Sequence, residues 1–339
     1  MSSSLKSTLK GFCEVARVNE ALVRARRSDL LVLCYHGIVT RSRPDRWSYA
    51  NWVEADSFRS QLRWLNHHFA PLDLAGLRCW HRQAWMGRKP PVLITFDDGY
   101  RNNLTIAAPI LREQRVPCLF FLATGFVGTT RVLWNDEVRV RVLHWADAEI
   151  AMPSGEWSAV PSELHARRAF SDRVNAECKR LTGDGPANYL QFLRAKTPSV
   201  EVMDDPEARA FMTWDEAREL ARMGFEIGSH TVEHPILSKI SRARATAELR
   251  ESKTMIEREL GQSCSAIAYP NGSVHDVDES VIEEVRAAGY DWGFMATPMW
   301  QKPGGDPHRI SRIGVPGHAD LATFKFYASG LHAQLSRPY

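Results

Sequence analysis

Two short motifs in the chain carry side chains that could bind a metal ion and move a proton. One apolar run ends in the adjacent carboxylates Asp97 and Asp98, followed by glycine (VLITFDDGY). A second run ends just before His230 and His234, which are four residues apart (FEIGSHTVEHP). Two histidines and one carboxylate can hold a divalent ion and leave positions open for water and substrate. Together the motifs indicate a metal site with a second carboxylate beside it that could accept a proton.

The two adjacent carboxylates are expected to have different roles. Neighbouring side chains on an extended chain point in opposite directions, so one can bind a cation while the other accepts a proton. On a helical turn, the i, i+4 spacing would place His230 and His234 on one face, within reach of one ion. Each motif also has a simpler explanation: an aspartate turn before a helix, or two unrelated surface histidines. Glu233 is predicted to face solvent.

The elements that must position these motifs alternate between short apolar runs and longer helical patterns. Short runs that are apolar throughout are typical of buried parallel strands. We predict strands at 30–35, 92–96, 118–122, 225–228, 266–269, 292–296 and 310–315. This order indicates an α/β fold, and the periodicity fits either an open doubly wound sheet or a closed barrel. In both, ligands bind at the carboxyl ends of the strands, where the two motifs lie.

Helices are predicted between the strands from apolar stripes and end signals. The stripe residues are Phe58, Leu62, Leu65 and Phe69 in one helix and Ala245, Leu249, Ile256 and Leu260 in another. Gly261 is the expected C-cap of the second helix, and Thr213 the expected N-cap of a third. The region from about 128 to 212 is polar, contains several Pro and Gly residues and breaks the alternation. We interpret it as a helical insertion that covers one end of the sheet.

Composition limits the class of protein. The 339 residues are 44% hydrophobic and 24% charged, as in ordinary globular proteins. The net charge is only +3 and the basic residues are interleaved with acids, so nucleic acid is not an expected partner. Six irregularly spaced cysteines fit buried free thiols in a reducing compartment, which favours a cytoplasmic location.

The first 29 residues are predicted to form a helical extension before a catalytic domain at 30–339. They lack the apolar core of a signal peptide, and no run in the chain reaches the roughly 20 apolar residues of a membrane span. Leu5, Leu9, Phe12, Ala16 and Val23 recur at near-helical spacing. We expect this stripe to pack on the protein itself, with attachment to a membrane surface as the alternative. The sequence predicts nothing about oligomeric state.

The motifs resemble those of the polysaccharide deacetylases, carbohydrate esterase family 4. Further similar segments are LCYHG at 33–37, AYPNG at 268–272, AGY at 288–290 and RISRI at 309–313. The resemblance covers roughly residues 30–127 and 213–316. It implies a distorted (β/α)7 barrel and hydrolysis of an N-acetyl group on a carbohydrate substrate. By this likeness Asp98, His230 and His234 would hold the metal and Asp97 would be the base. Zinc is the favoured ion, with nickel, cobalt or another divalent ion as alternatives.

The resemblance also implies candidates for the remaining roles. The backbone N–H of Asn271 would stabilise the oxyanion. The chain lacks the arginine that many members carry in this third motif, and Arg312 is the candidate to orient the base in its place, with a surface salt bridge as the alternative. It also lacks the usual C-terminal Leu-x-His, so His36 is the candidate acid, as in relatives that act on exopolysaccharides. A structural His36 is the alternative, and His308 and His318 are weaker candidates.

Two rival functions remain open at this point. One is hydrolysis of another amide or a cyclic imide by an allantoinase-like member of the same superfamily. The other is a carbohydrate-binding protein that has kept the fold without the activity. Aromatic side chains that could stack on sugar rings are Trp134, Trp214, Trp292 and Trp300, although most tryptophans are expected in the core.

Overall fold

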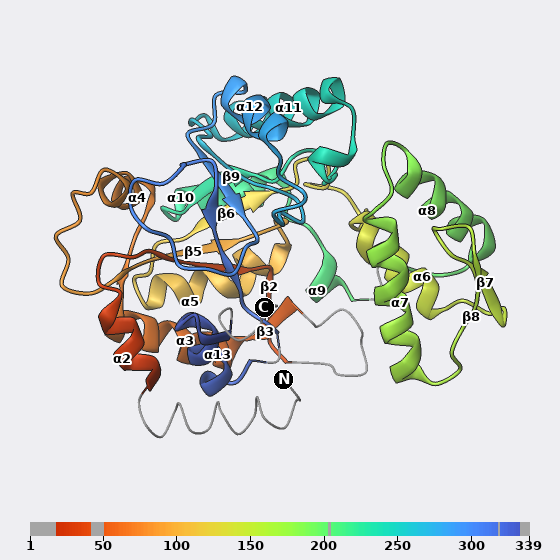
Figure 1. Cartoon of the computed structure of the whole chain (residues 1–339), viewed down its shortest axis with the longest axis horizontal. Helices are drawn as coiled ribbons and strands as arrows, with labels where there is room; N and C mark the ends of the chain where they lie inside the picture. The colour runs from red at the N-terminus through yellow and green to blue at the C-terminus, as the bar shows by residue number, and fades with distance from the viewer. Residues whose placement is uncertain (1–17, 42–50, 203–204, 318, 333–339) are drawn as a thin grey trace.

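The centre of the computed structural model is a parallel sheet that curves into a nearly closed barrel (Figure 1). The structure describes residues 18–41, 51–202, 205–317 and 319–332. The sheet has nine strands, eight of them along the path β12-β11-β10-β9-β6-β5-β1-β13. The strands are β1 (Leu31–Tyr35), β4 (Ala70–Pro71), β5 (Pro91–Phe96), β6 (Leu119–Leu122), β9 (Glu226–Ser229), β10 (Ala266–Ala268), β11 (Trp292–Met295), β12 (Ile310–Ser311) and β13 (Ile313–Gly314).

The barrel closes at its last segment. β12 pairs with β11, while β13, one residue further along, pairs with β1. Only Arg312 separates β12 from β13, so the two ends of the sheet meet at this residue. β12 and β13 therefore act as one strand in two halves. The predicted strands and the predicted barrel are confirmed.

The strands are mostly apolar because both of their faces are buried; the polar exceptions include Thr95, Glu226, Ser229 and Ser311. Leu31 and Leu33 belong to the large cluster between barrel and helices, whereas Leu30 and Val32 belong to a separate cluster inside the barrel. Trp80 of α4 joins the inner cluster. This alternation fixes which residues of each strand point into the barrel, and it continues into the residues that follow the strands.

Helices surround the barrel, and the three predicted helices are confirmed. The helices and 3-10 or π turns outside the insertion are α2 (Val18–Ala25), α3 (Ala55–His68), α4 (Leu74–His81), η2 (Asn103–Ala107), α5 (Ala108–Glu113), α10 (Trp214–Arg222), η3 (Leu237–Lys239), α11 (Arg242–Leu260), α12 (Glu279–Ala287) and α13 (Leu321–Ala328). Thr213 forms a capping box at the start of α10, and Gly261 ends α11 with a φ of 67°. β2 (Gly37–Val39) pairs with β3 (Trp52–Glu54).

The segment at 128–212 folds beside the barrel (Figure 1). Its elements are α6 (Trp134–Leu143), β7 (Glu149–Ala151), β8 (Trp157–Ala159), α7 (Leu164–Cys178), α8 (Gly185–Lys196) and α9 (Pro206–Arg209). The first five enclose a hydrophobic cluster of their own, which includes Val138, Val174 and Leu193. The buried carboxylate of Glu137 pairs with Arg141 within α6 and with the more exposed Arg194 of α8, and the second pair ties α6 to α8.

The N-terminal stripe can be followed only in part. Leu5, Leu9, Phe12 and Ala16 lie outside the described residues, whereas Val23 of α2 is fully buried in the main core. Within the described ranges, no helix is both long and apolar enough to cross a bilayer. Of the described cysteines, all are free and only Cys79 is exposed, which corrects its prediction as a buried thiol.

Glu226, at the start of β9, gives a prediction about pH and stability. Burial raises the pKa of its carboxyl group to about 7, above the unfolded value of about 4.3. The folded chain therefore binds more protons than the unfolded chain between about pH 4.3 and 7, and stability falls as pH rises through this window. Glu226→Gln should raise the free energy of unfolding at pH 8 by about 1 kcal/mol, a value reduced for solvent screening of a partly exposed group.

Urea unfolding of both proteins at pH 4 and pH 8 measures this difference. The glutamine oxygen can still accept the hydrogen bond that the carboxylate receives from the Leu74 N–H at 2.9 Å. The gain should therefore vanish at pH 4, where both side chains are neutral in the folded protein. An equal difference at the two pH values would show that the charge of Glu226 is not responsible.

Candidate metal centre and active site

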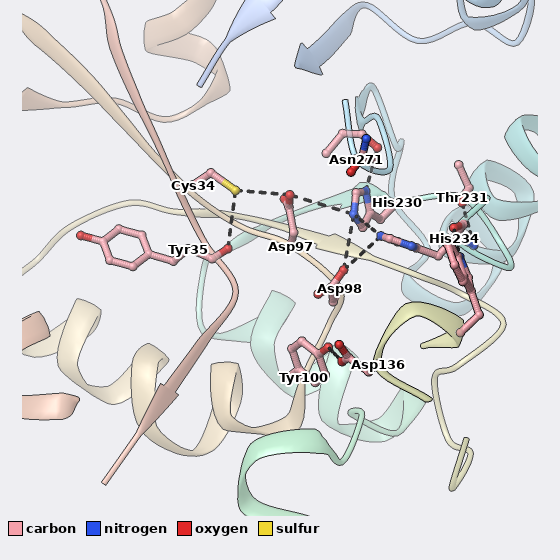
Figure 2. A network of polar contacts seen from close by, with 12 residues as sticks. Cys34, Tyr35, Asp97, Asp98, Tyr100, Asp136, His230, Thr231, His234 and Asn271 are labelled. Carbon is pink, nitrogen blue, oxygen red and sulfur yellow. Dashed lines mark hydrogen bonds and ion pairs between the residues drawn. The ribbon is translucent and has the colours of Figure 1, made fainter. Parts of the chain in front are cut away.

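The paired carboxylates lie where β5 ends. Asp97 continues the inward alternation of Leu93 and Thr95, while Asp98 has a φ of 76° and the following glycine a φ of 85°. Left-handed backbone is uncommon outside glycine, and here it turns the chain so that the two side chains diverge. Both carboxylates are almost fully buried. Figure 2 shows Asp97 directed toward Cys34 and Asp98 toward the two histidines.

Asp98, His230 and His234 converge on one point (Figure 2). Oδ1 of Asp98 lies 3.4 Å from Nε2 of His230 and 3.5 Å from Nε2 of His234. The two Nε2 atoms are 3.1 Å apart. The backbone oxygen of Ala268 lies 2.8 Å from Nδ1 of His230, so a proton on Nδ1 leaves Nε2 free as a ligand. This donor set fits a divalent ion.

The histidines meet without the helical turn that their spacing suggested, and that expectation is wrong. The residues after β9 form a loop in which Thr231 and His234 have φ values of 65° and 56°. Hydrogen bonds to neighbouring segments hold this loop: Glu248 of α11 accepts from the N–H groups of Val232 and Glu233 at 2.8 and 2.9 Å. The Thr231 hydroxyl accepts from the His234 N–H at 3.1 Å. The loop therefore places His234 by its own geometry.

The Glu233 side chain is 39% exposed, so its prediction as a solvent-facing residue holds in part, but it also has an ion-pair partner. Its carboxylate forms a two-pronged ion pair with Arg131, one prong of which is 3.0 Å long. Arg131 belongs to the segment that leads into the insertion and lies over the ring of Phe126 at 4.6 Å. Glu233 thus joins the histidine loop to the insertion.

Arg312 pairs with Asp97 at the seam of the barrel. Its Nη1 and Nη2 donate to Oδ1 and Oδ2 of Asp97 at 2.6 and 2.8 Å, and its Nη1 also donates to the Thr95 hydroxyl at 3.2 Å. Arg312 is 1% exposed, which rules out a surface salt bridge. Burial alone would raise the pKa of Asp97, but the charges of Arg312 and His230 outweigh it and hold the pKa well below its usual value. Asp97 is therefore ionised.

Cys34 and His36 approach Asp97 from β1. The inward alternation of Leu30 and Val32 continues through Cys34 to His36. Donor atoms of Cys34, His36 and Asp97 all lie within 4.8 Å of one another, and the Cys34 thiol donates to Oδ2 of Asp97 at 3.3 Å. The amide of Asn103 donates to the His36 backbone oxygen at 2.8 Å and fixes the loop that carries it. His36 therefore lies next to the base candidate.

Asn271 lies on the far wall of the same cavity. It has a φ of 61°, in the turn after β10, and its backbone N–H has no acceptor among the described residues. Its side chain accepts from Nζ of Lys179 at 2.7 Å and donates to Asp276 at 2.5 Å. The turn is thus held from both sides, and Lys179 reaches it from the end of α7.

The cavity around these residues has a volume of about 240 Å³. It brings together the predicted site residues Asp97, Asp98, His230, His234, His36, Asn271 and Arg312. The insertion contributes Trp134, Asp136, Arg139 and Lys179 to its walls. Trp134 was a candidate for stacking on a sugar ring, but Asp136, Arg139, Lys179 and Cys34 were missed as site residues. The resemblance ends before the insertion, and only the inward alternation of β1 could have indicated Cys34.

The weaker candidates lie elsewhere. His308 precedes β12, and its Nε2 lies 2.9 Å from the Tyr290 backbone oxygen, away from the metal centre. His318 lies outside the described residues. Of the four tryptophans, Trp134 lines the cavity, whereas Trp292 is buried in the barrel and Trp214 and Trp300 pack against the main core.

The pKa values of the two histidines shift in opposite directions. Burial and the neighbouring His230 lower the pKa of His234 to about 3. Burial opposes a charge on His230, but Asp97 and Asp98 outweigh it and raise its pKa. Neutral imidazole is the form that binds a metal, and a bound cation would favour it at both positions. Nδ1 of His234 has no hydrogen-bond partner among the described residues.

Comparison with known proteins identifies the family. The polysaccharide deacetylase profile matches residues 86–293, well over half of the chain, and the chain belongs to this family. YxkH from Bacillus subtilis is 26% identical over 112 residues, 33% of this chain and 39% of that protein. The curated relatives that match are covered over only about a quarter to two fifths of their length.

Solved structures show the same fold. The deacetylase PplD from Streptococcus pyogenes, in complex with acetate, superposes with a TM-score of 0.58 at 18% identity, covering 91% of this chain and 99% of that chain. IcaB from Ammonifex degensii gives a TM-score of 0.57 at 18% identity, covering 89% and 97%. Each superposition therefore extends over nearly the whole chain and is not limited to the barrel.

Proposed function

We propose that this protein hydrolyses the N-acetyl group of a glycan or glycan precursor with the help of a divalent metal ion. The observation that carries the proposal is the convergence of Asp98, His230 and His234 beside the ionised carboxylate of Asp97, in one cavity at the carboxyl ends of the strands. Membership of the polysaccharide deacetylase family supports the choice of reaction. The site then holds a metal on one side and a proton acceptor on the other.

Asp98, His230 and His234 would hold the metal, with zinc as the favoured ion. When bound there, a divalent ion would polarise the amide carbonyl and would lower the pKa of a bound water from 15.7 to about 7. Asp97 is a weak base because its pKa is low, and a metal held beside it would supply water that gives up a proton more readily. The pairing of Asp97 with Arg312 thus favours a metal-dependent reaction over one driven by the carboxylate alone.

The remaining residues would accept and donate the protons of the reaction and stabilise the oxyanion. Asp97 accepts the proton of the attacking water while the new C–O bond forms at the acetyl carbon. The Asn271 N–H, which has no acceptor among the described residues, can donate to the oxyanion. The C–N bond then breaks as His36 donates a proton to the departing amine nitrogen, which leaves acetate and a free amino sugar. Arg312 keeps Asp97 oriented and ionised.

His36→Gln should lower the rate of acetate release by about 10²-fold, the lower range for loss of a general acid. The substitution leaves the bond from Asn103 to the backbone oxygen intact and touches none of the three ligands. Metal content, measured by elemental analysis of the purified protein, should equal that of the wild type. A wild-type rate would remove His36 from the mechanism and leave it a structural residue.

Acetate release from N-acetylglucosamine oligomers, compared with ring opening of cyclic imides, tests the reaction class. We expect acetate from the oligomers and no imide hydrolysis. Hydrolysis of imides alone would favour the allantoinase-like alternative, and binding of oligomers without turnover would favour a carbohydrate-binding protein. A role in exopolysaccharide biosynthesis and a cytoplasmic location are part of the proposal, and the subcellular fraction that contains the protein tests the latter.

A further inference from the structure

A second, larger cavity adjoins the active site. Its volume is about 430 Å³, within the usual range of ligand pockets, and it lies between the insertion and the histidine loop. Trp134, Lys179 and Ile236 line both cavities. The catalytic cavity, at about 240 Å³, is smaller than most ligand pockets. A substrate longer than one sugar must therefore extend beyond it, and the larger cavity is directly adjacent.

The insertion is fixed against the barrel around this cavity. The Trp134 indole N–H donates to the His234 backbone oxygen at 3.2 Å. On another side, the Gly183 N–H donates to the Lys239 backbone oxygen at 2.7 Å. The ion pair of Arg131 with Glu233 adds a third contact. Specific contacts therefore fix the shape of the cavity, and both the insertion and the barrel contribute to its walls.

The walls combine apolar surface with an excess of positive charge. Apolar side chains include Phe126, Leu190 and Ile240. Five cationic residues and two acidic residues line the cavity: Arg131, Lys179, Arg194, Lys239 and Arg244, with Glu137 and Glu233.

The three arginines have carboxylate partners, but the two lysines do not. Arg131 pairs with Glu233, Arg194 with Glu137 at 2.6 Å, and Arg244 with Asp184 at 3.3 Å. Lys179 donates to the neutral amide of Asn271, and Lys239 has no side-chain partner, in the part of the chain that the structure describes. Lys239 therefore has no balancing negative charge among the described residues, whereas Lys179 has no direct carboxylate partner but lies within the electrostatic influence of Asp276, Asp136 and Asp172. A partly buried cation is stabilised by an anion that enters beside it.

We propose that this cavity binds an anionic group on the part of the substrate that adjoins the N-acetyl sugar, with Lys239 and Lys179 as its charge partners. The inference rests on the proposed deacetylation and adds a substrate class to it. The anionic oxygens belong to a phosphate ester or to a sugar carboxylate, which offer the same chemistry to an ammonium group. Trp134, at the junction of the two cavities, provides an aromatic face between the acetyl site and the anion site.

Lys239→Met tests the proposal, because Lys239 lines only the second cavity and methionine keeps the aliphatic stem. The probes are chitotetraose, N-acetylglucosamine 1-phosphate and a hyaluronan tetrasaccharide, which are neutral, phosphorylated and carboxylated. KM and kcat for acetate release and the calorimetric Kd are measured for each. Lys239→Met should raise KM and Kd about tenfold for an anionic probe. It should leave KM and Kd for chitotetraose unchanged, and kcat unchanged for every probe. Lys239→Glu should have a larger effect, and Lys302→Met, at an exposed lysine outside both cavities, none.

The binding and turnover results test the anion site and the deacetylase reaction separately. A loss confined to the phosphorylated or to the carboxylated probe supports the proposal and identifies the source of the charge. Equal changes for neutral and anionic probes, or no change in either Lys239 variant, would overturn it. If Lys239→Met weakens binding of an anionic probe but no probe yields acetate, the anion site stands and the deacetylase proposal fails.

Discussion

Replacing Asp97 with asparagine is expected to slow acetate release by about 10²- to 10⁴-fold, the usual contribution of a general base. An amide keeps the size of the carboxylate but cannot take the proton of the attacking water. The metal content should stay at the wild-type level, because Asp98, His230 and His234 supply the converging ligand atoms. Steady-state kinetics together with elemental analysis of the same protein sample measure both quantities.

Asp136→Asn is a matched control for this change. Asp136 is a buried carboxylate in the wall of the same cavity, and it accepts from the Tyr100 hydroxyl at 3.2 Å (Figure 2). Its loss should alter the rate much less than the loss of Asp97, because the Asp136 carboxylate faces Tyr100 and Arg139 rather than the metal ligands. A near-normal rate for Asp97→Asn, or equal losses for the two variants, would show that Asp97 is not the base.

Arg312→Leu is expected to destabilise the fold by about 3–5 kcal/mol, the typical cost of removing one partner of a buried ion pair. The side chains of Arg312 and Asp97 are 1% and 5% exposed, so the remaining carboxylate would be buried without its counter-charge. The guanidinium also donates to the backbone oxygen of Met295, at the end of the neighbouring strand β11, at 3.2 Å. Urea unfolding at pH 7 measures the loss.

The double variant Asp97→Asn/Arg312→Leu separates charge from packing. Removing the carboxylate as well should restore part of the stability, so the double variant should lose less than the sum of the two single losses. Arg309→Leu is the control, since Arg309 forms more exposed pairs with Glu279 and Asp306 and should cost under about 1 kcal/mol. If Arg312→Leu costs no more than Arg309→Leu, the buried pair does not stabilise the barrel.

The barrel could be predicted from the sequence because both faces of its strands are buried. That burial leaves short, mostly apolar runs, of which the run at 92–96 is typical, and each falls on an observed strand. Closure could not be predicted from periodicity. It depends on the pairing of Ile313 with Leu33 on one side and of Ile310 with Phe294 on the other, contacts between residues far apart in sequence.

The convergence of Asp98, His230 and His234 could be predicted because they follow the ends of β5 and β9, where a barrel brings side chains together. The conformation of the histidine loop could not, because the backbone of Thr231 and His234 is set by contacts with Glu248 and neighbouring strands rather than by local spacing. The site residues contributed by the insertion were the least predictable from the sequence. Nothing in its own sequence indicates that Lys179 reaches the turn at Asn271, since this contact requires the packing of α7 beside the barrel.

Metal titration of the chelated, metal-free protein tests the central claim most directly. Acetate release from N-acetylglucosamine oligomers is followed as Zn²⁺ is added to the wild type, to His230→Ala and to His67→Ala, an exposed histidine that serves as control. We predict no activity without metal, full activity at about one ion per chain for the wild type and His67→Ala, and no recovery for His230→Ala at the same concentration. Full activity of the metal-free wild type, or equal recovery of His230→Ala, would contradict a metal held by Asp98, His230 and His234.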